Sequence, residues 1–275
     1  MYRTRSIAKS EIDLSRPDAA RALVLSVRPW LVINSAAYTA VDRAESERNL
    51  AFAINADAPG AIAQACKQVG AVLVHLSTDY VFDGKTSTAY TETDQIGPIN
   101  VYGESKAQGE AQVRAVNDQH IILRTSWLFA RSGSNFVRTM LRLAMRDQEI
   151  AVVDDQFGTP TDAAQLAALI ATMADRLADG SPGPFGTFHA IGGEPLSWFR
   201  FAEAIFASAA RQGLQPPRLR PTTTDAYPTA AARPRFSLLD CSALARGWGL
   251  SVTPWTADFD RTVGFIMHDL KGAHS

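Results

Sequence analysis

Residues 71–84, AVLVHLSTDYVFDG, begin as an apolar run and change abruptly to hydroxyl and carboxylate residues. The apolar part, AVLVHLS (71–77), is continuous rather than alternating, as in a parallel strand that is buried on both faces. Similar short runs occur at LVIN (31–34), HIILRTS (120–126) and IAVVDD (150–155). Stretches with helical spacing of apolar residues lie between the runs, at 17–28, 44–69 and 103–116. This alternation predicts an α/β fold with a doubly wound parallel sheet.

A doubly wound sheet binds its ligands beyond the carboxyl ends of its strands. Polar loops follow three of the apolar runs: NSAAYTAVD (34–42), STDYVFDG (77–84) and RTSWLFA (124–130). Hydroxyl, amide and carboxylate side chains therefore meet at one edge of the predicted sheet, which is where we expect the ligand site.

Composition excludes several classes of function. Lys plus Arg number 27 and Asp plus Glu 28, so the 275-residue chain has no basic surplus for nucleic acid or a membrane surface. No apolar run reaches the length of a membrane span, and the N-terminus MYRTRSIAKSEIDL lacks the apolar stretch of a secretory signal. The two cysteines, Cys66 and Cys241, form no CxxC pair, which favours a reducing cytoplasm. The five scattered histidines give no metal-binding spacing.

The front of the chain departs from a complete dinucleotide-binding fold. Such a Rossmann-like fold opens with a strand, a glycine-rich turn and a helix whose N-terminus holds the pyrophosphate. No glycine precedes Gly60, and SEIDL (10–14) looks like a later strand before the helix at 17–28. We therefore expect a sheet without its first βα unit, and poor cofactor binding by this chain. On this hypothesis Met1 is an internal start, and the native gene encodes about 25–30 further residues.

The second half of the chain reads as a smaller, interleaved region. DDQFGTPT (154–161) and DGSPGPFGT (179–187) are rich in turn residues, and a helix is expected near 162–178. We expect residues 1–130 to form the dinucleotide-binding domain. Residues 131–275 are expected to form mostly a substrate-binding region, with the helix near 162–178 packing back on the first domain.

NVYGESK (100–106) places Tyr102 four positions before Lys106, so both side chains share one helix face. Free tyrosine titrates near ~10, and lowering its pKa to ~7 requires about 4 kcal/mol. An ammonium at ~4 Å supplies on the order of 4 kcal/mol at an effective dielectric constant of ~20. The spacing alone is common in surface helices. However, Ser77 and Thr78 end a strand beside the same crevice, which together with the tyrosine and lysine indicates a reductase site.

The motifs resemble the extended short-chain dehydrogenase/reductases and, within them, the dTDP-4-dehydrorhamnose reductase family. The segments that carry the resemblance are INSAAYTAVDRAE (33–45), NADAPGAIAQAC (55–66), LVHLSTDYVFDG (73–84), NVYGESKAQGE (100–110), ILRTSWLFA (122–130), NFVRTML (135–141), DDQFGTPT (154–161) and AYPTAAARPRFSLLD (226–240). The likeness runs from about residue 10 to the C-terminus. It implies a two-domain reductase of dTDP-rhamnose biosynthesis that uses NADPH or NADH to reduce a 4-keto dTDP-sugar.

The resemblance assigns roles to individual residues. Tyr102 is implied as the proton donor, Lys106 as the group that binds the nicotinamide ribose and lowers the tyrosine pKa, and Thr78 as a partner of the reacting carbonyl. The residues expected at the cofactor are Asp13, Ala36, Ala37, Thr39, Ser77, Tyr102 and Lys106, and those expected at the substrate are Thr78, Asp79, Trp127 and Arg233.

Three of these positions, and the nearby Asp42, also have a simpler structural interpretation. Arg233, in a polar loop, suits a diphosphate through its forked guanidinium, but a solvated surface arginine is the alternative. Trp127 offers a stacking face for the sugar, or else belongs to the core. Asp79 is expected near the sugar hydroxyls, and the alternative is that it caps a helix. For Asp42 we favour capping of the next helix.

Two other functions remain open on the sequence. One is a non-catalytic binding protein like the regulatory subunit of methionine adenosyltransferase, which has a similar fold; the other is a sugar-nucleotide epimerase. The presence of Tyr102 and Lys106 weighs against the first, and RTSW (124–127) with DQFGTPT (155–161) weighs against the second. A homodimer is compatible with the sequence, and magnesium is implied by family resemblance only.

Overall fold

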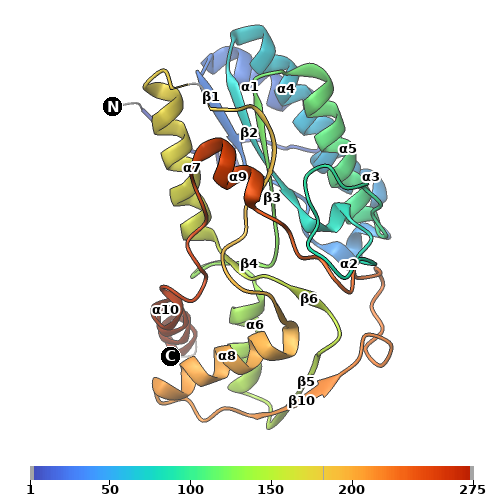
Figure 1. Ribbon diagram of the computed structural model, residues 1–275, viewed down its shortest axis with the longest axis vertical. Helices are drawn as coiled ribbons and strands as arrows, with labels where there is room; N and C mark the ends of the chain where they lie inside the picture. The colour runs from blue at the N-terminus through green and yellow to red at the C-terminus, as the bar shows by residue number, and fades with distance from the viewer. Residues whose placement is uncertain (1–2, 182, 273–275) are drawn as a thin grey trace.

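The computed structural model describes residues 3–181 and 183–272 and contains a four-stranded parallel sheet in the order β1-β2-β3-β8 (Figure 1). The strands are β1 (Leu31–Asn34), β2 (Val72–Thr78), β3 (His120–Thr125) and β8 (Gly186–His189). Three of the predicted apolar runs therefore form neighbouring strands, and the predicted α/β fold with a parallel sheet is confirmed.

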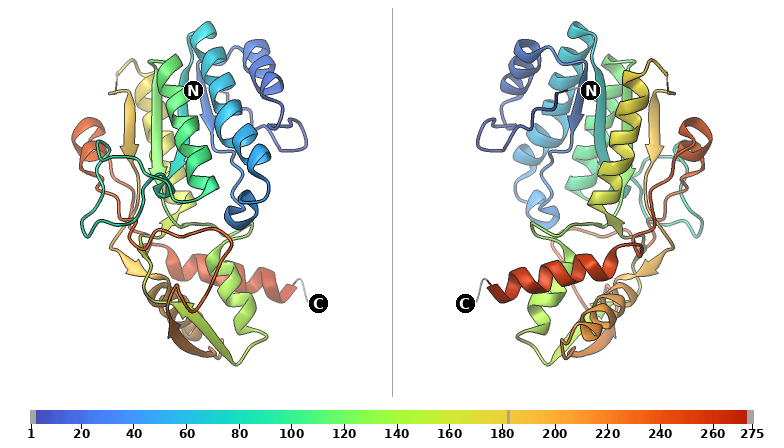
Figure 2. Two further views of the ribbon diagram at one scale, coloured as in Figure 1. Left: turned by 90° about the vertical axis from the view of Figure 1, so that its right-hand side faces the viewer. Right: turned by 90° about the vertical axis from the view of Figure 1, so that its left-hand side faces the viewer.

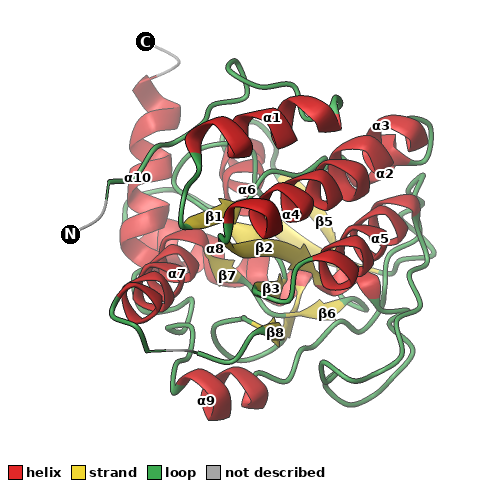
Figure 3. Cartoon of the chain, turned by 90° about the horizontal axis from the view of Figure 1, so that it is seen from above, coloured by secondary structure: helices red, strands yellow, loops and turns green. Residues whose placement is uncertain are grey.

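Helices cover both faces of this sheet (Figure 3). On one face lie α1 (Pro17–Val27), α4 (Ala58–Val69) and α5 (Val101–Val116), whose apolar residues pack against Leu73 and Ile122. On the other face, α7 (Ala163–Ala178) and α9 (Ser242–Trp248) pack against Val74, Ile121 and Leu123. Because each strand alternates its side chains between the two faces, a continuous apolar run supplies both cores.

A second region lies beyond the carboxyl ends of the strands (Figure 2). It contains α6 (Phe136–Ala144), α8 (Trp198–Arg211), α10 (Phe259–Gly272) and the parallel pair β5 (Glu149–Val153) and β10 (Arg218–Thr222). These elements share one aromatic-rich core around Phe129, Phe201 and Phe259. Two short pairings, β4 (Leu128–Phe129) with β7 (Thr161–Asp162) and β6 (Phe157–Gly158) with β9 (Leu196–Ser197), lie where the chain passes between the regions.

The observed strands differ from the sequence predictions in three places. IAVVDD (150–155) does form a strand, β5, but it pairs with β10 in the second region and not with the main sheet, where β8 pairs with β3. The strand β8 itself was missed because it follows a turn-rich stretch. SEIDL (10–14) is not a strand. The carboxylate of Asp13 accepts hydrogen bonds from the backbone N–H and the hydroxyl of Ser15 at 2.9 and 2.7 Å, which folds the chain into a turn before α1.

The predicted helix at 44–69 is interrupted. It is divided into α2 (Val41–Ala44), α3 (Arg48–Phe52), a π-helical turn η1 (Ala53–Asp57) and α4. The backbone is continuously helical from α3 through η1 into α4, and Pro59, which has no N–H to donate, lies directly after the π-helical turn. Among the described residues, no helix has the length and apolar character that crossing a membrane requires.

Candidate active site

Two residues of the candidate site, Thr78 and Asp79, lie at the carboxyl end of β2. Thr78 caps a short 3-10 helix, η2 (Asp79–Val81), because its Oγ1 accepts the backbone N–H of Tyr80 at 3.2 Å. The same hydroxyl donates to Asp79 Oδ1 at 3.0 Å. Asp79 is 2% exposed, and its Oδ2 has no hydrogen-bond partner among the described residues. Burial raises the pKa of Asp79 to about 6, and the hydroxyls of Ser237 and Thr78 oppose this shift.

Tyr102 lies in the first turn of α5. The helix begins there because Asn100 Oδ1 accepts the backbone N–H of Gly103 at 2.8 Å. A Cβ at position 103 would come within 2.1 Å of Tyr80 O, so the glycine lets α5 pack directly on η2. The ring of Tyr80 meets that of Tyr102 edge-to-face, with centroids 5.6 Å apart. The glycine after Tyr102 thus brings the tyrosine beside the end of β2.

Burial raises the pKa of Tyr102 to about 12, although a hydrogen bond with Thr78 lowers it. Lys106 makes no resolved contribution to this pKa, so the predicted lowering of the Tyr102 pKa by the lysine is not observed. Tyr102 is fully protonated at neutral pH, which is the form that a proton donor needs.

Lys106 follows one turn later on α5 and is 2% exposed. Its Nζ donates to Leu76 O at 2.7 Å and lies 3.5 Å from His75 Nε2. Burial lowers the pKa of Lys106 to about 8, and the negative charge of Glu110 opposes this shift. The lysine is thus close to its titration midpoint at physiological pH, which is unusual for this residue type and typical of functional sites.

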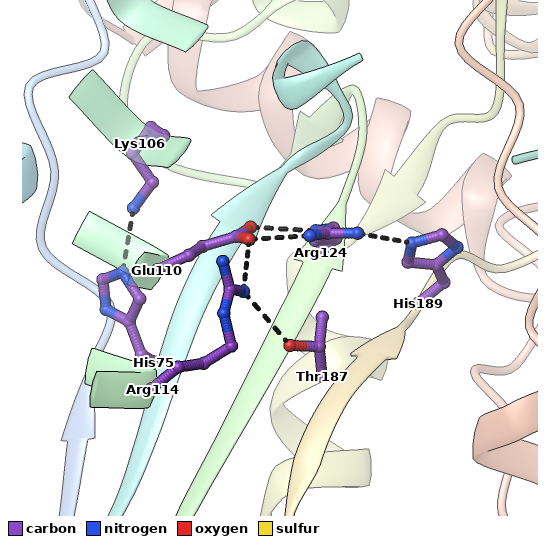
Figure 4. A network of polar contacts seen from close by, with 7 residues as sticks. All are labelled: His75, Lys106, Glu110, Arg114, Arg124, Thr187 and His189. Carbon is purple, nitrogen blue, oxygen red and sulfur yellow. Dashed lines mark hydrogen bonds and ion pairs between the residues drawn. The ribbon is translucent and has the colours of Figure 1, made fainter. Parts of the chain in front are cut away.

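A buried ionic network lies next to Lys106 (Figure 4). Both carboxylate oxygens of Glu110 accept hydrogen bonds from Arg124 on β3, at 2.9 and 2.7 Å. Arg114 adds a third hydrogen bond to the same carboxylate at 2.9 Å, and Arg124 also lies 3.4 Å from His189 Nε2. The sequence reasoning missed this network. The available signal was an arginine inside the apolar run HIILRTS and a glutamate four residues after Lys106.

The loop after β1 carries three of the predicted cofactor residues, Ala36, Ala37 and Thr39. Ala36 and Thr39 are exposed and Ala37 is partly buried. Asn55, in the π-helical turn, anchors this loop: its side chain accepts the N–H of Tyr38 at 2.8 Å and donates to the carbonyl oxygen of Tyr38 at 3.0 Å. The amide of Asn55 also reaches Ser105 Oγ on α5 at 3.0 Å. One buried amide therefore fixes the loop relative to the helix of Tyr102.

Arg233 forms an ion pair with Asp42, a partner that the sequence did not indicate. Its Nη2 donates to Asp42 Oδ2 at 2.8 Å, and its Nη1 donates to Ala231 O at 2.7 Å. Asp42 Oδ1 accepts the N–H of Ala231 at 3.1 Å. Partial burial is the largest single influence on the pKa of Asp42 and raises it, but the hydrogen bonds from Arg233 and from the backbone N–H of Ala231, together with the charge of Arg233, outweigh it and hold the pKa below the usual value. Asp42 does lie in the first turn of α2, as expected, but its carboxylate makes no capping hydrogen bond to that helix and binds Arg233 and Ala231 instead.

Trp127 follows β3 in a left-handed backbone conformation, with φ of 47°. One face of its indole stacks on Trp198 of α8, with ring centroids 3.5 Å apart. A Cβ at Gly158 would come within 2.5 Å of the same ring, so this glycine lets β6 approach the tryptophan. The ring thus packs between elements of the second region.

The remaining predicted residues lie at different depths. Ser77 is buried on β2, whereas Asp13 is exposed in the turn before α1 and holds Ser15. Within residues 3–181 and 183–272, no group of three or more His, Cys, Asp or Glu side chains is arranged to hold a metal ion.

Comparison with known proteins gives consistent relatives. A family model described as RmlD substrate binding domain matches residues 2–266. The curated dTDP-4-dehydrorhamnose reductase of Shigella flexneri is 42% identical over 251 residues, which cover 90% of this chain and 84% of the relative. That of Burkholderia thailandensis is 42% identical over 275 residues, with 96% and 90% covered.

Solved structures agree with these relatives. The dTDP-4-dehydrorhamnose reductase of Bacillus anthracis in complex with NADP superposes with a TM-score of 0.83 at 37% identity, covering 96% of this chain and 89% of that chain. An enzyme of the same name from Clostridium acetobutylicum gives a TM-score of 0.84 at 35% identity, with the same coverage. The similarity therefore extends over both the sheet and the second region.

Proposed function

This chain belongs to the dTDP-4-dehydrorhamnose reductase family, and we propose that it reduces the 4-keto group of dTDP-6-deoxy-L-lyxo-4-hexulose to give dTDP-L-rhamnose, with NADPH or NADH as the reductant. The observation that carries the proposal is the meeting of Thr78, Tyr102 and Lys106 where β2 ends beside the first turns of α5. An acid, a hydrogen-bond donor and a cation at one point are what carbonyl reduction requires.

The proton step follows from the protonation state of Tyr102. Tyr102 is fully protonated, so it can give its hydroxyl proton to the carbonyl oxygen as hydride reaches the carbon. The Thr78 hydroxyl turns its proton from Asp79 to the same oxygen. The phenolate left on Tyr102 needs a counter-charge, and an ammonium at ~4 Å contributes about 4 kcal/mol at an effective dielectric constant of ~20. Lys106 in its charged form is the group that can supply it.

The residues near the nicotinamide end fit a dinucleotide. A lysine ammonium has three donors, and Lys106 uses one on Leu76 O, so others remain for ribose hydroxyls. Ala36 is exposed and has a small side chain, so a flat ligand can lie against the backbone there. The bound cofactor supplies the hydride from its nicotinamide ring. The residues that we propose contact it are Asp13, Ala36, Ala37, Thr39, Ser77, Tyr102 and Lys106.

We assign the sugar nucleotide to the boundary between the two regions. The unpaired Asp79 Oδ2 can accept a hydrogen bond from a sugar hydroxyl, and the Arg233 guanidinium can exchange Asp42 for a diphosphate. Trp127 would contact the sugar with the part of its ring that Trp198 leaves uncovered. On this proposal residues 1–130 hold the cofactor and also supply Asp79 and Trp127 to the substrate. Residues 131–275 form mostly the substrate-binding region, apart from α7, β8 and α9, which belong with the main sheet.

The test is a coupled assay with the purified chain, NADPH and the 4-keto dTDP-sugar. At NADPH concentrations raised to offset the weak cofactor binding expected from the sequence, we expect loss of NADPH absorbance together with formation of dTDP-rhamnose. We expect no NADPH loss with dTDP-glucose, which has no keto group. An epimerase would convert the sugar without net NADPH oxidation, and a binding protein would do neither. Either result would overturn the proposal.

A cytoplasmic location and a homodimer belong to the same proposal. The two cysteines of the sequence, Cys66 and Cys241, are both free thiols, which suits a reducing compartment. Cell fractionation and light scattering test the two statements separately from the assay.

A further inference from the structure

Three buried polar side chains stand in a row beneath the active site. Asn34 ends β1, His75 lies in the middle of β2, and Lys106 reaches toward them from α5. Asn34 Nδ2 is 3.1 Å from His75 Nδ1, and His75 Nε2 is 3.5 Å from Lys106 Nζ. All three are at most 6% exposed, so water does not compete for these contacts. Figure 4 shows the ring of His75 pointing at the lysine.

The orientation of Asn34 determines which ring nitrogen of His75 carries the proton. Asn34 Oδ1 accepts the backbone N–H of Ala36 at 3.3 Å, so the amide nitrogen faces the imidazole and donates to Nδ1. Burial holds the pKa of His75 well below its usual range, and the ring is therefore neutral. A neutral imidazole has one acceptor nitrogen and one N–H. Since Nδ1 is the acceptor, Nε2 carries the proton and points it at Lys106.

This tautomer does not suit an ammonium. A lysine ammonium can only donate, so an N–H that points at it is an unfavourable contact between two positive dipole ends. A lysine amine has a lone pair that can accept this N–H. Among the titratable groups that face Lys106, Glu110 on α5 favours the charged form, but Arg124 and Arg114 already hold its oxygens. Tyr102, one turn away on α5, is neutral, and His75 is the group that faces the lysine from β2.

We propose that His75 is a positioning residue for Lys106: fixed by Asn34 in the tautomer that carries its proton on Nε2, it stabilises the neutral amine and so sets the upper pH limit of the activity. The catalytic consequence rests on the proposed reductase function, whereas the tautomer itself does not. Ala36, which orients Asn34, lies in the loop assigned to the cofactor, so the same row links that loop to the charge of the lysine.

The first experiment is 15N NMR of the full chain labelled at its five histidines, with the His75 signals assigned by their loss in His75→Leu. We expect the proton of His75 on Nε2, with Nδ1 bare, across neutral pH. The isosteric change Asn34→Asp replaces the amide donor by an acceptor and should move the proton to Nδ1. A wild-type proton on Nδ1 would overturn the proposal without reference to any activity.

The second experiment is the pH profile of kcat for wild type, Asn34→Asp and His75→Leu. With a Lys106 pKa of about 8, wild-type kcat should fall as the pH rises through this value. Both variants remove the N–H that points at Lys106. The alkaline limb, which is the pH range in which kcat falls, should therefore move to higher pH by roughly half a unit to one unit. The matched control His268→Gln changes an exposed histidine on α10 and should leave the limb in place.

His75→Leu introduces no charge, so its sign is decisive. If Nε2 were the acceptor of an ammonium, removing the ring would take away a partner of the charge and move the alkaline limb downward. A downward shift, or an unchanged limb in both variants, would show that His75 does not stabilise the amine. If His75→Leu does not fold, His75→Gln provides the assignment instead, and the tautomer in the wild-type spectrum still decides the proposal.

Discussion

Glu110 on α5 and Arg124 on β3 form a doubly hydrogen-bonded ion pair that is almost completely buried, one helical turn beyond Lys106. Such a pair is seldom more stable than apolar residues of the same shape, but removing one partner leaves an uncompensated buried charge. It also ties the helix that carries Tyr102 and Lys106 to the sheet at a single orientation. The pair therefore fixes the position of α5, the helix to which we assign the catalytic residues.

Glu110→Gln should lower the free energy of unfolding by about 3–5 kcal/mol, because Arg124 would keep its charge in the core without a counter-charge. The matched control is Glu104→Gln on the same helix, whose ion pair with Arg48 is partly exposed. That change should cost no more than about 1 kcal/mol. Urea unfolding of both variants is the measurement, and equal losses would mean that burial of the pair does not matter.

The main sheet was predictable because its central strands are short, continuous apolar runs, and such runs are typical of parallel strands that are buried on both faces. The run 71–77 supplies residues to both cores, and that alone identified β2. By contrast, β8 contains only Gly-Thr-Phe-His, and its place beside β3 comes from packing under α9. The partner of β5, the strand β10, lies about 70 residues away in sequence, and no local pattern indicates such a pairing.

Within the site, the sequence identified residues whose relationship is local. Tyr102 and Lys106 share one helix, and Thr78 ends the preceding strand, so the strand-then-helix order was enough to bring them together. The contact of Arg233 with Asp42 spans 191 residues and depends on how a late loop returns over α2. Asn55 was also missed, because its role comes from a π-helical turn that sequence periodicity does not reveal.

Tyr102→Phe should reduce kcat by roughly 10²–10⁴-fold, because it removes the donated proton while keeping the ring. Affinity for dTDP should stay close to wild type, since the nucleotide is assigned to other residues. Tyr227→Phe serves as the control, because this tyrosine is 58% exposed. A kcat near the wild-type value in Tyr102→Phe would remove the tyrosine from the role of proton donor.

Arg233→Ala should weaken dTDP binding by about 1.5–3 kcal/mol, roughly 10- to 100-fold in Kd, through loss of a charge-assisted contact with the diphosphate. Asp42→Asn should bind dTDP at least as tightly as wild type, because it frees the guanidinium from its competitor. Arg235→Ala, which removes an exposed guanidinium paired with Asp225, is the matched control and should leave Kd unchanged. Calorimetric titration with dTDP alone measures all three, and unchanged affinity in Arg233→Ala would return this residue to a structural role.

Asp79 should make the stability of the protein depend on pH in the direction opposite to that of most carboxylates. Burial places its folded pKa at about 6, above the ~3.9 of an unfolded aspartate. Between these values the folded state binds more protons than the unfolded state, so the contribution of Asp79 to the free energy of unfolding falls as the pH rises. A shift of about two units corresponds to roughly 3 kcal/mol.

Asp79→Asn removes this titration. The free energy of unfolding of the variant relative to wild type should therefore rise by up to roughly 3 kcal/mol between about pH 4 and pH 7. Asp83→Asn is the control with the opposite sign, because the hydrogen bond from Tyr90 holds the pKa of Asp83 below its usual value. The contribution of Asp83 is present above the unfolded pKa and is lost as the pH falls. Urea unfolding of the three proteins across this range is the measurement, and a pH-independent difference between Asp79→Asn and wild type would show that the buried carboxyl does not titrate there.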